Sequence, residues 1–337
     1  MRFVMILLGV ISAWLQSDNL MVAYITDAGD LYVWQAGESQ LVASGDVSAV
    51  TVSPAGDIAY VQGDSLWLVQ DDEAHQAMES VNVAQMTWAD RYLYFNIYEE
   101  GFLAPSGSLF RLDPTTDIVT EVEGGGWING DVRVMSGDYA TGEDGRIIWG
   151  DFEWTFEPVA TASHFVFYPE VQWQDETTLR VAIPQPDAIY EEVHYLPVAL
   201  WELTPDSATQ IGEIDARFFG LPVWAGDYMA YLRLEDGLYI AQADGTSPQQ
   251  VFAGDVWSYL WLKDRLVYLT EDGIFTVRYG EEPKLWLEVI PIQMQTVGDG
   301  LLFTLMDGLY YAELEGEPLR LTNSIVIVWF GLILLTP

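Results

Sequence analysis

Two segments of this chain, 96–107 and 184–198, carry the same triplet of one tyrosine followed by two glutamates. Aromatic rings can stack on a sugar or a peptide, and neighbouring carboxylates can accept hydrogen bonds or hold a cation. We interpret both segments as candidate binding loops, together with the aromatic segments 161–170 and 213–222. The predicted ligand-binding residues are Tyr98, Glu99, Glu100, Phe102, His164, Tyr168, Tyr190, Glu191, Glu192, His194, Arg217 and Phe219. The alternative is that these are surface loops, which lengthen at little thermodynamic cost.

Histidine is the other residue type here with catalytic or metal-binding chemistry. The chain has three, His75, His164 and His194, which are far apart and lack the spacing of zinc ligands, so no zinc site is expected. His164 has the chemistry of a general base, and the alternative is an ordinary histidine of a loop or of the core.

The motifs of other catalytic classes are missing from the sequence. There is no Gly-x-Ser-x-Gly elbow, and the glycine-rich stretch 124–130 lacks the lysine of a phosphate-binding loop. The absence of cysteine excludes disulfides and thiolate chemistry. With 51 acidic residues, paired carboxylates occur by chance and do not indicate a glycosidase. No Asp-x-Asp-x-Asp-Gly loop is present, so we expect no dedicated calcium site and no cofactor. The alternative is calcium held loosely by loop carboxylates.

The charge balance limits the partners. The 51 acidic residues face only 13 basic ones, which gives a net charge of −38. Nucleic acid and anionic lipid surfaces are bound through clustered Lys and Arg, so neither is expected as a partner. The acidity is interpreted as a solvated surface, and a cation-collecting role is the alternative.

A short strand-like pattern recurs along the chain and predicts the elements that must position any site. It consists of a small or acidic residue, an aliphatic residue and usually an aromatic one. The aliphatic positions are Leu31, Leu66, Leu109, Leu200, Leu238, Ile274 and Leu309. The gap between Leu109 and Leu200 is about twice the others, and the stretch 145–151, with Ile147 at the aliphatic position, supplies the missing copy. The sequence therefore contains eight repeat units.

Each copy is the third of four predicted strands. An alternating apolar run precedes it across a Gly-Asp or Asp-Gly turn, which is typical of a β-hairpin, and a further run lies on either side of the hairpin. Aromatic residues at 14% also favour strands over helices. Four strands per unit predict an all-β fold, an eight-bladed β-propeller of four-stranded antiparallel blades, with seven blades as the rival count.

The stretch "SPAGDIAY" (53–60), followed by "SLWLVQ" (65–70), resembles the TolB-like β-propeller repeat family. The resemblance implies a ring-shaped, usually exported scaffold. Its motif residues are structural turns, so it implies no catalytic residue for this chain.

The ends of the chain suggest where the protein is located and how the ring is closed. Arg2 and the uncharged stretch 3–15 have the layout of a secretory signal, so 1–17 is expected to be a signal peptide or an N-terminal anchor. Residues 18–337 are expected to form a single propeller domain. Its predicted units lie near 20–43, 45–78, 83–121, 124–160, 169–212, 218–252, 256–288 and 291–323.

The apolar stretch from Ile325 to Leu335 is predicted to be a strand buried on both faces. As a closing strand at 324–330 it would pair with the first unit, which lacks a first strand of its own. A membrane tail is the alternative.

Together these features predict a secreted, periplasmic or cell-envelope protein without an integral membrane span, expected to be a monomer. We expect a non-catalytic binding or scaffold module for a protein, peptide or glycan. The alternatives are a propeller hydrolase or lyase with a site at the channel mouth, and a purely structural envelope component.

Overall fold

The computed structural model describes residues 20–333 with internal gaps. The residues that it leaves undescribed are 1–19, 72, 80, 98–107, 136, 138–141, 158–168, 186–194, 218–220, 234–235, 315 and 334–337. Every regular element of the described part is a β-strand. Among these residues no helix is long and apolar enough to cross a membrane.

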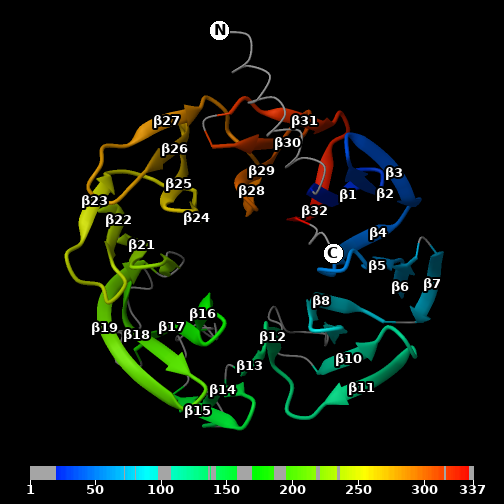
Figure 1. Cartoon of the computed structure of the whole chain (residues 1–337), viewed down its shortest axis with the longest axis horizontal. Coiled ribbons are helices and arrows are strands. Elements are labelled where there is room, and N and C mark those ends of the chain that lie inside the picture. Colours follow the sequence, from blue (N-terminus) through cyan, green and yellow to red (C-terminus); the bar gives the residue numbers. More distant parts are fainter. Residues whose placement is uncertain are drawn as a thin grey trace, which may run out of the picture. The chain divides into compact units, whose positions relative to one another are not determined.

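In the described part of the chain, thirty-two strands form eight four-stranded antiparallel sheets, which are the blades of an eight-bladed β-propeller (Figure 1). The chain divides into two compact units, 1–125 with 291–337, and 126–290. The predicted fold class is confirmed, and eight rather than seven is the blade count. The stretch 145–149 is the third strand of the fourth blade, as the repeat spacing predicted.

The unit made of 1–125 and 291–337 contains blades 1, 2, 3 and 8. Blade 1 consists of β1 (Leu20–Thr26), β2 (Leu31–Gln35), β3 (Glu38–Ala43) and β32 (Val326–Ile333), and blade 2 of β4 (Val47–Val52), β5 (Ile58–Gln62), β6 (Ser65–Gln70) and β7 (Glu73–Met78). Blade 3 consists of β8 (Val83–Ala89), β9 (Tyr92–Ile97), β10 (Leu109–Asp113) and β11 (Ile118–Val122), and blade 8 of β28 (Gln293–Val297), β29 (Gly300–Leu305), β30 (Gly308–Glu313) and β31 (Leu319–Thr322).

The unit 126–290 contains blades 4 to 7. Blade 4 consists of β12 (Trp127–Asn129), β13 (Val132–Met135), β14 (Gly145–Trp149) and β15 (Phe152–Phe156), and blade 5 of β16 (Glu170–Asp175), β17 (Thr178–Pro184), β18 (Tyr195–Thr204) and β19 (Ser207–Arg217). Blade 6 consists of β20 (Val223–Ala225), β21 (Tyr228–Arg233), β22 (Gly237–Gln242) and β23 (Gln249–Phe252), and blade 7 of β24 (Ser258–Leu262), β25 (Arg265–Thr270), β26 (Gly273–Val277) and β27 (Lys284–Leu287).

The C-terminal strand completes the first blade. β32 pairs antiparallel with β1, from Leu20 opposite Ile333 to Thr26 opposite Val326, and the two strands lie side by side in Figure 1. The predicted closure by the C-terminal strand is therefore confirmed. Blade 1 takes its first strand from the end of the chain, so β1 has no unpaired edge.

One part of that prediction is wrong, because β32 is not buried on both faces at its start. Ile325 and Ile327 are 42% and 48% exposed, whereas Val326 is buried. The register between β1 and β32 shifts after Ile25, which leaves Ile327 as the extra residue of a β-bulge. A residue without a cross-strand partner is free to turn its side chain to solvent.

The cores lie between neighbouring blades, and blade 6 shows how the strand period builds them. Met229 and Tyr231 of β21 pack against blade 5, whereas Ala230 and Leu232 pack against blade 7. Successive side chains of a strand point to opposite faces, so one apolar strand serves both interfaces. This is why β21 is apolar in nearly every position.

The repeated Asp-Gly turns are explained by a close contact inside the blade. A Cβ on Gly237 would lie 2.0 Å from the carbonyl oxygen of Phe252, in the fourth strand of blade 6. Gly273 and Gly308 meet fourth-strand carbonyls in the same way, at 2.4 and 2.2 Å. In these blades glycine is needed because the third strand begins directly against the fourth.

Blade 5 departs from the expected loop boundaries. β19 has 11 residues, and its pairing with β18 continues to Arg217 opposite Tyr195. The first half of 213–222, which we interpreted as a candidate binding loop, is therefore strand. The alternation of exposed Glu213 and Asp215 with buried Ile214 and Ala216 supports this extension.

Candidate functional site

The residues predicted from the sequence cannot be assembled into a site. Eleven of the twelve, all except Arg217, lie outside the described residues. The backbone of Arg217 belongs to β19, but its side chain is not described. The strands that flank the two predicted loops pair as hairpins, β9 with β10 and β17 with β18. The role of these loops in binding stays a prediction.

His75 makes a hydrogen bond that links two blades. Its Nε2 lies 3.0 Å from Oδ1 of Asp117, and both side chains are about half exposed. The pair joins β7 of blade 2 to the residue before β11 of blade 3. Among the described residues no group of three His, Cys, Asp or Glu side chains is arranged to hold a metal ion.

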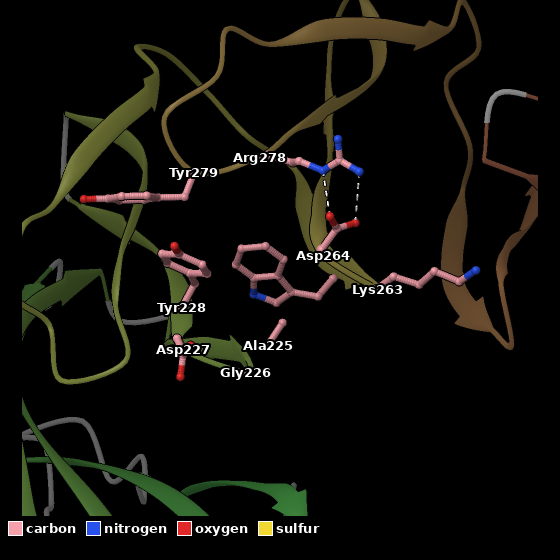
Figure 2. Close-up of a pocket in the computed structure, with 9 residues that line it drawn as sticks. Ala225, Gly226, Asp227, Tyr228, Lys263, Asp264, Arg278 and Tyr279 are labelled. Carbon is pink, nitrogen blue, oxygen red and sulfur yellow. Dashed lines mark hydrogen bonds and ion pairs between the residues drawn. The ribbon is translucent and has the colours of Figure 1, made fainter.

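A pocket of about 410 Å³ lies where blades 6 and 7 meet (Figure 2). It is built from three tight connections: the turn between β20 and β21, the turn between β24 and β25, and the residues that follow β26. The lining residues are Ala225, Gly226, Asp227, Tyr228, Trp261, Lys263, Asp264, Arg278 and Tyr279. Its volume is within the range of about 300–1,000 Å³ that small-ligand pockets span.

Blade topology explains why these segments meet. In an antiparallel sheet the first-to-second and third-to-fourth connections lie at one end, and the second-to-third connection lies at the other. All three segments of the pocket belong to the first kind. The predicted loop 184–198 of blade 5, in the same unit, joins a second strand to a third, so its flanking strands end at the opposite side of the sheet.

Three aromatic side chains form the apolar part of the pocket. The rings of Tyr228 and Tyr279 are stacked (Figure 2), with centroids 4.8 Å apart and planes 25° apart, and Trp261 also lines the pocket. The hydroxyl of Tyr279 donates to the carbonyl of Ser247 at 3.1 Å, and Nε1 of Trp261 donates to the carbonyl of Val223 at 2.9 Å. These bonds fix both rings, so the aromatic surface is preorganised.

An ion pair forms the polar part. Nε of Arg278 donates to Oδ2 of Asp264 at 2.7 Å, and Nη2 to Oδ1 at 3.4 Å, which is a forked arrangement. These hydrogen bonds from Arg278 hold the pKa of Asp264 below its ordinary value. Asp264 is therefore ionised at neutral pH, and the pair presents one compensated charge of each sign.

Lys263 begins the turn between β24 and β25 in a backbone conformation that side chains disfavour. Its φ is +56°, whereas the equivalent first turn residues of blades 4, 6 and 8 are Gly130, Gly226 and Gly298. The left-handed conformation costs a non-glycine residue roughly 1–2 kcal/mol. In Figure 2 the Lys263 side chain extends away from the aromatic rings.

Blade 5 holds one wall of the pocket in place. The side-chain amide of Gln172 accepts from the backbone N–H of Trp224 at 2.8 Å and donates to the Trp224 carbonyl at 2.6 Å. Nη1 of Arg180 donates to the carbonyl of Gly226 at 2.6 Å. Burial lowers the pKa of Arg180, and the nearby Glu202 opposes that shift. These two side chains position the turn that carries Tyr228.

We expect Gln172→Leu to lower the free energy of unfolding by about 2–3 kcal/mol, because it leaves two backbone groups of Trp224 unpaired. Chemical denaturation measures the change. Gln210→Leu is the matched control, since Gln210 is exposed in the same blade and makes only a 3.4 Å bond to Gly212. Equal stability of the two variants would show that Gln172 does not hold the turn.

The sequence contained one signal for this pocket that we did not use. Lys263 is one of only two lysines, and it occupies a turn position where three other blades have glycine and blade 3 has Asp90. The pocket is made not from long loops but from short connections of the kind that recur between blade strands. Their meeting depends on how two blades pack, which the strand pattern does not specify.

The fold and the pocket together define an eight-bladed β-propeller with a small cleft between two blades. No protein-family model matches the chain, and no curated protein matches it significantly.

Solved structures resemble the chain in fold. A eukaryotic initiation factor is 9% identical with a TM-score of 0.57, over 93% of this chain and 98% of that one. The computationally designed Ika8 protein is 9% identical with a TM-score of 0.50, over 88% and 92%. The β-propeller domain of the trilobed protease from Pyrococcus furiosus is 12% identical with a TM-score of 0.48, over 91% and 95%. At these identities the likeness concerns the fold alone.

Proposed function

We propose that this protein is an exported, TolB-like propeller that acts as a non-catalytic binding module, and that the pocket between blades 6 and 7 is one of its ligand sites. The observation that carries the proposal is the pocket itself, in which a fixed aromatic surface adjoins a forked Arg278–Asp264 pair. Ligand pockets combine a mostly apolar lining with a few placed polar groups in this way.

The non-catalytic assignment follows from the chemistry of the lining. The acidic group Asp264 is held ionised by Arg278, so it is not a proton donor at neutral pH. The lining contains no histidine, serine or cysteine, and both oxygens of Asp264 accept hydrogen bonds from Arg278, which weakens Asp264 as a base or a nucleophile. Groups of this kind orient a ligand rather than transform it.

Export is supported by the sequence. The uncharged stretch that follows Arg2 has the layout of a secretory signal, and the turn "SPAGDIAY" resembles a family of usually exported scaffolds. The predicted loops 96–107 and 184–198 are proposed as a second contact region, for a protein, peptide or glycan.

Binding to an array of immobilised oligosaccharides and peptides tests the proposal. Tyr228→Ala should weaken retention of the bound ligand at least tenfold, because it removes half of the stacked pair. Trp257→Ala is the control: it removes a 56% exposed aromatic of the same unit that does not line the pocket. The proposal fails if Tyr228→Ala, folded by its melting curve, binds as the unaltered protein does.

A further inference from the structure

We propose that the ligand of the pocket between blades 6 and 7 is the ring of a neutral sugar, stacked on the aromatic surface and hydrogen-bonded through its hydroxyls to the Arg278–Asp264 pair. This inference rests on the proposed function and names its ligand class. Three features of the pocket carry it: balanced charge, aromatic rings whose polar atoms are already bonded, and polar groups arranged for hydroxyls.

The charge balance of the pocket disfavours an ionic ligand. The lining carries two basic residues, Arg278 and Lys263, and two acidic ones, Asp264 and Asp227, and Glu281 lies 3.8 Å from Nη1 of Arg278. An anion would meet two aspartates and the field of a chain with a net charge of −38. A cation would meet the guanidinium of Arg278 beside the rings that would otherwise attract it. A neutral ligand is repelled neither by the aspartates nor by Arg278.

The aromatic rings offer apolar surface rather than hydrogen bonds. The N–H of Trp261 and the hydroxyl of Tyr279 are each bonded to a backbone carbonyl of blade 6. What these two residues present to a ligand is therefore carbon surface. One face of a sugar ring consists of C–H groups, and such a face can bury against flat aromatic carbon.

The Arg278–Asp264 pair supplies hydrogen-bond donors and acceptors for the hydroxyl groups of a ligand. Each oxygen of the Asp264 carboxylate accepts one hydrogen bond from Arg278 and has lone-pair capacity for another. A hydroxyl both donates and accepts, so neighbouring hydroxyls can satisfy a carboxylate and a guanidinium together. The forked pair holds these groups at fixed spacing, which gives selectivity for a rigid ring over a flexible chain.

An array with four probe classes tests the inference: neutral hexose oligosaccharides, uronate oligosaccharides, lysine-rich peptides and aspartate-rich peptides. We expect the neutral sugars to bind, and Asp264→Asn to weaken them at least tenfold. The same substitution removes the carboxylate closest to Arg278 and leaves the more distant Glu281 beside it, so uronate binding should rise at least tenfold. Asp272→Asn, at an exposed turn of blade 7 outside the lining, is the matched control and should change neither affinity.

The outcomes separate this inference from the proposed function. Binding of peptides or uronates, but of no neutral sugar, that Tyr228→Ala abolishes would overturn the ligand class and leave the binding module standing. Neutral-sugar binding that neither Tyr228→Ala nor Asp264→Asn changes would overturn the pocket as its site, and the proposed function with it. Absence of binding in all four classes would overturn the ligand class.

Discussion

Deleting residues 324–337 is expected to lower the free energy of unfolding by at least about 5 kcal/mol, because it removes the strand that completes blade 1. Val326 and Trp329 of β32 pack into the core against blade 8, and Val328 and Phe330 into the core against blade 2. Each large apolar side chain that is fully buried contributes about 1.5–3 kcal/mol. The deletion also exposes the edge of β1, whose seven residues are all buried, so we expect aggregation as well.

Thermal melts followed by circular dichroism and light scattering measure both effects. Removing only 334–337 is the control, since it leaves all of β32 in place, and its melting temperature should be unchanged. If the deletion variant does not accumulate, Val326→Asp provides a milder test, because it places a charge at a position that is 5% exposed. A melt that the longer deletion leaves unchanged would contradict closure by β32.

Gly237→Ala is expected to lower the free energy of unfolding by about 2–5 kcal/mol. One part of this arises from the backbone, because φ is +94° at Gly237 and alanine disfavours this region by roughly 1–2 kcal/mol. The other part arises from the new Cβ, which would stand 2.0 Å from the carbonyl oxygen of Phe252. Overpacking of this kind typically costs about 1–3 kcal/mol.

Gly37→Ala separates the two contributions. Gly37 has nearly the same φ, +90°, and a Cβ there would meet nothing within 4 Å. Denaturant titration of both variants should show Gly237→Ala to be the less stable by at least about 1 kcal/mol. Equal losses would mean that the repeated glycine serves only the turn and not the approach of the fourth strand.

The architecture was predictable because its cause is local and repeated. Each third strand begins with a tight turn followed by an aliphatic residue such as Leu238, which packs between blades. In the eight copies of the pattern, only the first unit lacks a first strand. The apolar C-terminal segment was the part of the chain able to supply that strand. The exposure of Ile327 was not predictable, since it depends on a bulge in a single register.

The candidate site was not predictable for a different reason. Tyr228 and Tyr279 are 51 residues apart in the sequence, and each resembles the strand-end tyrosines of other blades. Only the packing of blade 7 against blade 6 brings them to 4.8 Å. The strand pattern also does not show that Gln172 of blade 5 holds the backbone of Trp224. Hydrogen bonds between blades do not produce a periodic pattern of residue types in the sequence.

Hydroxyl-radical footprinting of the protein with and without a bound neutral oligosaccharide tests the location of the site most directly. If the pocket between blades 6 and 7 is the site, Tyr228, Trp261 and Tyr279 lose reactivity in the complex, while the exposed Trp257 does not. Protection confined to the loops 96–107 and 184–198, with unchanged reactivity at the three pocket aromatics, would contradict this location.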